Sequence, residues 1–565
     1  MPTSPEPTPL RVEIEAEPLP AEVGPELRSA LLSHPVVRSH FPGADLWLVS
    51  LDFPDKGRAE GDDQNLPFRA VLADMAGDAV IEAEGRLWEL DAVDAWPTSR
   101  SRLPNDEEHA WAAELVLRDA DLAARVEEGR AELYRPVPAL ANVQDPAGTL
   151  ERAVTVGIRE VPGDGGPATH RTVAVRTVDG DIIAISPPAA GEAGLAPAGP
   201  AAVAAGDSVA DAHAVGPGGG QARVRVYRDE ELLWDLVVVR PAASSGANGS
   251  GVELREVDYL GVRALQRGHV PIVNVAYADG RASRNWLNEE APFEADAGEG
   301  ESDAVAGFRV CPAPARTALD RGHGGGAFRG VALWVEGDEV VIASELQAGW
   351  HRYVSQWSLH ADGTIKPRLL FAAMRNPQTG DPHTHHAYWR LDFDIISPEV
   401  NQVQEHNQPT LPGQLAPWHT VRWEVSRPRD PGHGREWRVR SVRSPHGYTI
   451  VPGPHDGVAD EFGAGDFWVL AHHADELDDG QGATTDPHRA RAQLDRFVTS
   501  ELVEREDVVV WYAAHVPGTG EGGPAAGPDL TPFNWKRVER SAYVPLEPPP
   551  TLGPDEDDDE DDDDE

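Results

Sequence analysis

Short valine-rich runs separated by glycine and proline are the feature that most limits the fold of this chain. Examples are LLWDLVVVR at residues 232–240, VALWVEGDEVVIASEL at 331–346 and DVVVWYAAHV at 507–516. Runs of this length, rich in β-branched residues and bounded by turn signals, are typical of strands. They outnumber the long helical patterns, so the sequence predicts a mainly β protein.

Length and composition limit the architecture further. A chain of 565 residues is too long for one ordinary domain, so two to four domains are expected. An apolar fraction of 40% with 16 tryptophans is enough to build cores. The single cysteine, Cys311, excludes an internal disulfide framework and a thiolate metal cluster.

The charge argues against a nucleic-acid partner. The net charge is −46, which would repel phosphates. Eleven of these charges form an uninterrupted acidic run, Asp555 to Glu565, which favours a role in solubility over a binding site. The first residues show no signal-peptide pattern, and no apolar run approaches the roughly 18 residues of a membrane helix. We therefore expect no membrane partner and a cytoplasmic location.

Helical and strand patterns divide the chain into consecutive units. Helical patterns at 24–37 and 106–129 each begin a small α+β domain, whereas the stretch rich in alanine, glycine and proline before residue 222 has linker composition. The β-rich remainder predicts a large antiparallel β-sandwich. The expected divisions are a disordered N-terminus at 1–9, α+β domains at 10–100 and 101–185, a linker at 186–221, the sandwich at 222–548 and a disordered acidic tail at 549–565.

The segment HTHHAYWRLDFDI, residues 383–395, carries the clearest metal chemistry. Because side chains alternate along a strand, His383 and His385 point to the same face and can bind one ion. Ligation by nitrogen alone suits Cu(II) or Zn(II), and copper has the higher intrinsic affinity. A third ligand must come from elsewhere. The alternative is that these are ordinary surface or core histidines.

The order of several motifs resembles the copper amine oxidases. His-X-His at 383–385 is followed by Arg-Leu-Asp-X-Asp at 390–394, as in that family. FEADAGEG, GYTIVPG, FWVLAHHADEL and REDVVVWYAAHVP also resemble family segments, and lie at 293–300, 447–453, 467–477 and 505–517. The resemblance implies two small α+β domains ahead of a large antiparallel β-sandwich, and a homodimer.

The resemblance also assigns roles to individual residues. It implies Asp296 as the catalytic base and His515 as the third copper ligand. The family has three more residues between the tryptophan that matches Trp511 and its histidine, so His472 and His473 are the alternatives. Glu294 stands where the family has a gating tyrosine.

A second, calcium-type site is implied by the same resemblance. Its ligands would be the carboxylates of Asp392, Asp394 and Asp507 with the carbonyls of Phe393 and Val508, and oxygen ligands of this kind suit Ca²⁺. The alternative is a set of solvent-facing carboxylates at a sheet edge.

The family makes its quinone cofactor, topaquinone, from a tyrosine in an Asn-Tyr-Asp/Glu stretch. In the matching segment, residues 345–365, Trp350, His351 and Arg352 occupy these three positions. Histidine has no phenol ring, so topaquinone is not expected.

Three interpretations follow. In the first, His351 lies beside the copper in a non-quinone centre. In the second, a slip of two residues, which keeps the same strand face, brings Tyr353 to the cofactor position and preserves amine oxidation. In the third, the protein is a non-catalytic copper-binding relative.

We favour the first interpretation, a copper-dependent oxidase that uses O₂. The preference for an amine substrate is implied by the resemblance alone. Glu294 and Asp296 would favour a cationic substrate by electrostatics.

Overall fold

The computed structural model describes most of the chain between residues 8 and 535. It leaves out the internal segments 17–22, 44–45, 53–66, 75–78, 87–88, 99–103, 105, 137–139, 145–149, 161–168, 186–219, 247, 298–304, 322–324, 349–350, 374–381, 409, 411–415, 464, 474–475, 485–486 and 519–522. The expected linker and disordered N-terminus are therefore described only at residues 220–221 and 8–9, and the acidic tail lies outside the described residues.

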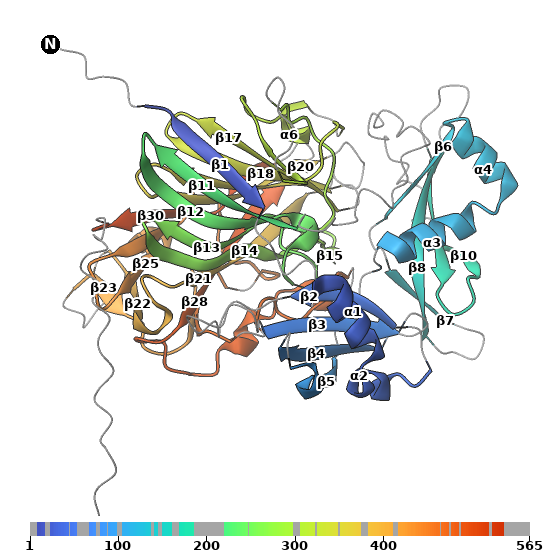
Figure 1. Ribbon diagram of the computed structural model, residues 1–565, viewed down its shortest axis with the longest axis horizontal. Coiled ribbons are helices and arrows are strands. Elements are labelled where there is room, and N and C mark those ends of the chain that lie inside the picture. The colour runs from blue at the N-terminus through green and yellow to red at the C-terminus, as the bar shows by residue number, and fades with distance from the viewer. Residues whose placement is uncertain are drawn as a thin grey trace, which may run out of the picture.

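The first small domain is a four-stranded antiparallel sheet with two helices (Figure 1). Its elements are α1 (Val23–Ser33), α2 (Pro35–His40), β2 (Leu46–Asp52), β3 (Pro67–Asp74), β4 (Val80–Arg86), η1 (Leu90–Ala92) and β5 (Asp94–Thr98). Leu27 and Leu31 of α1 pack on Leu72 and Ile81 of the sheet. The predicted single helix is split because Pro35 cannot continue α1 and instead begins α2.

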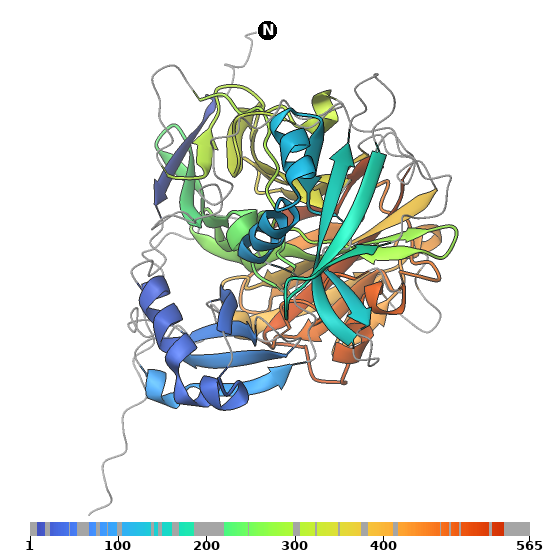
Figure 2. The same ribbon diagram turned by 90° about the vertical axis from the view of Figure 1, so that its right-hand side faces the viewer.

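The second small domain places two helices beside a five-stranded antiparallel sheet (Figure 2). Its elements are α3 (Asp106–Val116), α4 (Ala120–Glu127), β6 (Ala131–Tyr134), β7 (Leu140–Gln144), β8 (Leu150–Glu160), β9 (Thr169–Arg176) and β10 (Ile182–Ile185). The expected single helix breaks where the Asp119 side chain accepts from the amides of Asp121 and Leu122, which caps α4. A buried ion pair of 2.7 Å between Arg152 and Glu108 joins β8 to α3.

Residues 10–16 depart from the expected division of the chain. They form β1 (Leu10–Ala16), which pairs along its whole length with β11 (Gln221–Arg228) at the edge of the large sandwich. Arg225 bonds Glu15 across this pair, and Ile14 lies opposite Val224. Matched charges and apolar residues on alternate positions favour this long-range pairing. The first small domain therefore begins after β1.

Two large sheets form the rest of the molecule. The first has ten strands, in the order β1, β11, β12 (Glu231–Val239), β13 (Glu253–Tyr259), β14 (Val262–Tyr277), β21 (His383–Phe393), β28 (Val508–Gly518), β27 (Phe467–Ala471) and β24 (Val425–Arg427), with β15 (Ala282–Arg284) on β14. The second has eleven strands, in the order β16 (Phe308–Val310), β17 (Val331–Glu336), β18 (Glu339–Ala348), β19 (His351–His360), β20 (Ile365–Ala373), β30 (Asp529–Phe533), β26 (Gly447–Val451), β25 (Glu436–Ser441), β22 (Asn401–His406) and β23 (Trp418–Thr420), with β29 (Gly523–Ala526) on β20. Short helices lie in the connections: η2 (Pro241–Ala243), α6 (Ala318–Arg321), η3 (Pro398–Val400), η4 (Pro431–His433), α7 (Pro487–Ala490) and η5 (Leu494–Phe497).

The two sheets pack face to face over one continuous apolar core. Odd-numbered residues of β21 and β19 face it, including Trp389, Leu391, Tyr353 and Trp357. Tyr388, an even-numbered residue of β21, lies instead in a smaller core on the outer face of the ten-stranded sheet. The mainly β prediction, with large antiparallel sheets and few helices, is confirmed.

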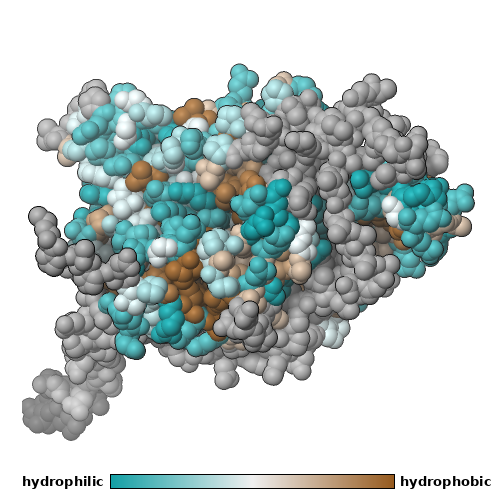
Figure 3. Space-filling model, turned by 90° about the horizontal axis from the view of Figure 1, so that it is seen from above, coloured by the Kyte–Doolittle hydropathy of each residue, from teal (hydrophilic) through white to brown (hydrophobic). Residues whose placement is uncertain are grey.

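One face of the molecule mixes polar and apolar residues. In Figure 3, hydrophilic residues make up much of the coloured surface, and hydrophobic residues form several patches among them. Among the described residues, no helix has the length and apolar character needed to cross a membrane.

Replacement of one tryptophan that packs between the two sheets should strongly destabilise the protein. Trp437 of β25 stacks on Phe467 of β27, with ring centroids 3.9 Å apart and no exposed surface on either residue. Replacing Trp437 with Ala should lower the free energy of unfolding by about 3–5 kcal/mol, because a large cavity remains. Chemical denaturation measures this change. Trp423→Ala is the control, because Trp423 is 58% exposed, and an equal loss in both variants would contradict the prediction.

Candidate metal centre

Two histidines of β21 meet inside the sandwich. His383 and His385 point into the space between the sheets, and their Nε2 atoms lie 3.1 Å apart. Their ring centroids are 4.8 Å apart, and the residues are 6% and 4% exposed. The expected same-face pair is therefore present and shielded from solvent.

The opposite sheet supplies a third imidazole. His351 begins β19, and its ring centroid lies 5.5 Å from that of His385 and 6.2 Å from that of His383. Tyr353, two residues along the same face, has its ring centroid 5.9 Å from that of His385. The cluster therefore joins residues from both sheets, which fits the position expected for His351.

Two residues that the sequence did not single out complete this cluster. The Asn285 side-chain amide donates to Nδ1 of His351 at 3.1 Å and also to the Tyr353 hydroxyl. The Tyr277 hydroxyl lies 3.5 Å from Nε2 of His351, and its ring packs beside His383. Neither residue belongs to a recognisable motif, because an isolated asparagine or tyrosine at a strand end carries no spacing signal.

The donor set fits a nitrogen-bound transition metal. Two nitrogen atoms 3.1 Å apart, each about 2.0 Å from one ion, subtend an angle of about 100° at that ion. This angle lies between the square-planar and tetrahedral values, and both geometries occur with imidazole ligands. His351 would have to move closer to join the other two on one ion, because its ring centroid is 5.5 and 6.2 Å from theirs.

Burial keeps His351 and His385 in the form that binds metal. Desolvation, together with the nearby His383 and Arg352, lowers the pKa of His351 to about 3. Desolvation also lowers the pKa of His385 well below its ordinary value, with His351 and His383 adding to the effect. Only a neutral imidazole has a lone pair for a metal.

His515 does not join this cluster, contrary to the expected ligand set. It lies directly across the strand pair from His386, and Nδ1 of His515 is 2.7 Å from Nδ1 of His386. Because side chains alternate, His386 and His515 point to the outer face while His383 and His385 point inward. The structure thus separates His515 from the pair that it was expected to complete.

The residue three positions beyond His515 explains this difference. Gly518 pairs with His383 and lies on the inner face. A Cβ atom at Gly518 would come within 2.3 Å of Nε2 of His383. The position that the family spacing indicates is therefore glycine here, with no room for a side chain as His383 now lies.

The expected catalytic base differs from these imidazoles in its surroundings. Asp296 is exposed, whereas the imidazole cluster is buried. Glu294 pairs with Arg321 at 2.7 Å and Arg316 at 3.3 Å, so much of its charge is neutralised. The role of Asp296 stays a prediction, and Glu294 gives little support for a cationic substrate.

The three carboxylates of the expected calcium site do come together. Ligand oxygens of Asp392, Asp394 and Asp507 all lie within 4.8 Å of one another. Asp392 and Asp394 are buried, so they are not solvent-facing residues at a sheet edge. Phe393 and Val508 are partners at the adjoining end of the strand ladder.

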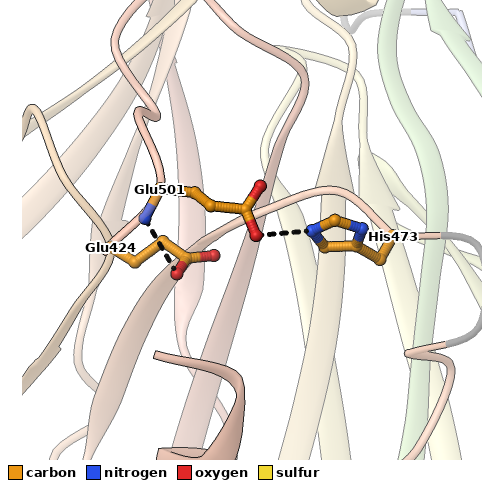
Figure 4. Close-up of side chains that lie close together, drawn as sticks. All are labelled: Glu424, His473 and Glu501. Carbon is orange, nitrogen blue, oxygen red and sulfur yellow. Dashed lines mark hydrogen bonds and ion pairs between the residues drawn. The ribbon is translucent and has the colours of Figure 1, made fainter. Parts of the chain in front are cut away.

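The two alternative copper ligands lie at other sites. His472 contacts this carboxylate group, with Nε2 3.6 Å from Asp392 and Nδ1 3.7 Å from Asp507. His473 lies with Glu424 and Glu501, and its Nε2 is 3.2 Å from the Glu501 carboxylate (Figure 4).

The Glu424–His473–Glu501 group has metal-ligand spacing but is already hydrogen-bonded. One Glu424 oxygen accepts from the Ala471 amide, and the other accepts from Thr499 and from the Glu501 amide. The side chains of His473 and Glu501 are 41% and 48% exposed. These hydrogen bonds join the loops that contain His473 and Glu501 to the ends of β24 and β27.

Comparison with known proteins gives the fold. No protein-family model matches the sequence, and no curated protein matches it. A copper-containing benzylamine oxidase from Hansenula polymorpha is similar in structure, with a TM-score of 0.58 and 11% identity over 94% of this chain and 98% of that chain. A structure of the Pichia pastoris lysyl oxidase PPLO has a TM-score of 0.52 and 12% identity over 96% of this chain and 92% of that chain.

The protein has the copper amine oxidase fold. The likeness extends over nearly the whole chain, including both small domains and the sandwich. At these identities it establishes the fold, while the chemistry has to be argued from the residues.

The buried histidine predicts a pH-dependent stability. His351 has a pKa of about 3 in the folded protein against 6.5 ordinarily, so the unfolded chain binds a proton that the folded chain does not. The contribution of neutral His351 to the free energy of unfolding is complete above about pH 6.5. Below this pH it decreases by about 1.4 kcal/mol for each unit that the pH falls. Denaturation of metal-free wild type and His351→Gln at pH 7 and about pH 5 measures this. The same change in the free energy of unfolding between the two pH values in both proteins would contradict it.

Proposed function

We propose that the protein is a copper-binding oxidoreductase whose copper lies on His351, His383 and His385. The observation that carries this proposal is the buried meeting of three imidazoles from both sheets, with two Nε2 atoms 3.1 Å apart. Bringing three imidazoles together inside the core costs desolvation free energy, which a shared metal ion would offset. The fold supports the same proposal, because a similar structure is described as copper-containing.

Asn285 would orient His351 for this role. At present the Asn285 amide nitrogen faces Nδ1 of His351 and the Tyr353 hydroxyl, while its oxygen accepts from Ser283. Turning the amide by 180° would let its oxygen accept from N–H at Nδ1 and from the Tyr353 hydroxyl. The lone pair of Nε2 would then be free for copper, which is the usual support for a metal-binding histidine.

The substrate class we propose is a small primary amine, and the oxidant is O₂. The balanced reaction converts R–CH₂–NH₂, O₂ and H₂O into an aldehyde, ammonia and H₂O₂. Bound copper would supply one-electron exchange. The buried cluster would exclude bulk water, and the Tyr353 phenol would stay protonated because burial raises its pKa well above the ordinary value.

A second candidate function rests on the position of Tyr353. This phenol lies on the same strand face as His351 and packs against His385. It is therefore close enough to the imidazoles to serve as a quinone precursor, which would preserve the amine oxidation of the fold's named relatives. Its buried hydrogen bond to Asn285 gives it a structural role as well.

Copper binding should depend on the inner-face histidines. With one equivalent of Cu(II), electron paramagnetic resonance should show a signal from three nitrogens. His385→Ala should abolish that signal, and His351→Ala should reduce the nitrogen count to two. His515→Ala is the matched control and should retain the signal, since His515 points to the outer face.

Two outcomes would contradict this proposal. A three-nitrogen signal that survives His385→Ala, or disappears in His515→Ala, would place the copper elsewhere. A phenylhydrazine adduct formed after aerobic copper loading, and lost in Tyr353→Phe, would establish the quinone interpretation instead. Oxygen uptake with primary amines, absent in His385→Ala, separates an oxidase from a silent copper protein.

We also propose that Asp392, Asp394 and Asp507 hold Ca²⁺. Oxygen atoms about 2.4 Å from one ion can be no more than about 4.8 Å apart, and these carboxylates meet that limit. Ca²⁺ should raise the thermal midpoint of wild type, because it binds the folded state. Asp394→Asn should weaken this effect at least tenfold in Ca²⁺ concentration. Glu501→Gln, in the other acidic group, should respond like wild type, and an unchanged response in Asp394→Asn would remove the assignment.

A further inference from the structure

A second histidine pair lies on the outer face of β21, back to back with the first. His386 and His515 are 0% and 3% exposed, and their Nδ1 atoms are 2.7 Å apart. Two carboxylates flank the pair. Asp466 lies 3.2 Å from Nε2 of His515, and Asp460 lies 3.8 Å from Nε2 of His386.

With one ring proton on each imidazole, the hydrogen bonds fix which nitrogen carries it. Nε2 of His515 faces two acceptors, the Asp466 carboxylate and the Gly465 carbonyl, each at 3.2 Å. This nitrogen must therefore carry hydrogen, which leaves Nδ1 of His515 as an acceptor. Nδ1 of His386 then donates to it, and Nε2 of His386 keeps its lone pair.

That lone pair has no hydrogen-bond partner in the part of the chain that the structure describes. Nε2 of His386 is buried, and the nearest Asp460 oxygen, at 3.8 Å, is beyond hydrogen-bond distance. Two ligand atoms that each lie about 2.0–2.2 Å from one tetrahedral Zn²⁺ ion are about 3.3–3.6 Å apart, so the Asp460 oxygen would move a few tenths of an ångström closer to share an ion with His386. An ion between them would satisfy both groups.

The loop that carries Asp460 is built to hold it in place. One Asp460 oxygen accepts from the amides of Phe462 and Gly463 at 2.8 and 2.6 Å. The other oxygen faces His386. Gly463 lies against the imidazole pair, and a Cβ atom there would come within 2.4 Å of Nδ1 of His386. The glycine thus lets the loop close over the histidines.

Asp466 holds His515 in position on the side away from His386. Besides His515, it accepts from the amides of Arg429 and Ala459 at 2.6 and 2.7 Å. Burial alone would raise the pKa of Asp466, but the hydrogen bonds from His515 and the Arg429 amide, together with the Arg429 charge, lower it. A charged carboxylate behind a histidine is the arrangement that orients metal-binding imidazoles and increases their basicity.

We propose that His386 and Asp460 form a second transition-metal site, for a divalent ion such as Zn²⁺, on the outer face of β21. Water completes the coordination, entering from the side of Asp460, whose side chain is 43% exposed. His515 and Asp466 are positioning residues that do not touch the ion. This site is independent of the copper centre proposed on the inner face.

A cobalt titration tests the site in the full-length protein. Co²⁺ replaces Zn²⁺ and absorbs visible light, and excess Ca²⁺ occupies the carboxylate site. Asp460→Asn keeps the oxygen that accepts the loop amides but removes the charge. Glu461→Gln is the matched control, because it removes an exposed charge one residue away.

Wild type and Glu461→Gln should bind the same number of Co²⁺ ions. Asp460→Asn should bind one fewer, or bind that ion at least tenfold more weakly, and His386→Gln should do the same. His515→Gln should weaken Co²⁺ binding at this site about 10–100-fold. Equal binding by Asp460→Asn and Glu461→Gln overturns the proposal, as does a wild type with no Asp460-dependent ion.

The test separates this site from the proposed copper function. His383→Gln with His385→Gln should lose the copper signal but keep the Asp460-dependent cobalt ion. If that double variant does not fold, the comparison of Asp460→Asn with Glu461→Gln decides alone. Asp460-dependent binding in a protein without the three-nitrogen copper signal would remove the proposed function and keep the outer site.

Discussion

The alternation of side chains along β21 is the constraint on which both histidine clusters depend. The strand is central in its sheet, between β14 and β28, and both of its faces are covered. His383 and His385 therefore point into the core between the sheets, while His386 points into the smaller outer core. One run of four residues supplies buried imidazoles to two separate environments. Each imidazole must stay neutral or find a partner.

The inner cluster also depends on how the two sheets pack. Sheets that pack face to face lie about 10 Å apart, so a histidine of β19 and histidines of β21 can meet midway between them. Trp357 and Trp389 fill the same core, and close packing there fixes the spacing. A metal held by residues from both sheets would be sensitive to that spacing, because its ligands do not share a backbone segment.

The sequence predicted the sheets better than the contacts between distant segments. Valine-rich runs and turn residues were enough for a mainly β fold, because alternation and turns are local signals. The pairing of β1 with β11 was missed, since residues 10–16 meet partners about two hundred positions away and no local pattern selects them. The same is true of Asn285, which reaches His351 only through the sandwich.

The structure separates His515 from the copper ligands that it was expected to join, for a reason that the sequence did contain. The family spacing is three residues longer, and an odd shift along a strand moves a side chain to the opposite face. By contrast, Asp392, Asp394 and Asp507, which the resemblance grouped, do lie together, and the first two are alternate residues at the end of β21. Whether a residue lies on the correct face of its strand is therefore a stricter test of a ligand inferred from a resemblance than whether it lies in a matching segment.

The two departures on the inner face belong together in physical terms. Gly518 gives the inner face of β28 no imidazole at the position paired with His383, and His351 of β19 brings the inner cluster to three imidazoles. A chain that had lost all use for the ion would gain nothing from an added buried histidine, whose desolvation costs free energy. In the proposed copper centre, His351 would add a nitrogen ligand from β19, and the ion rather than a ring would carry the electrons.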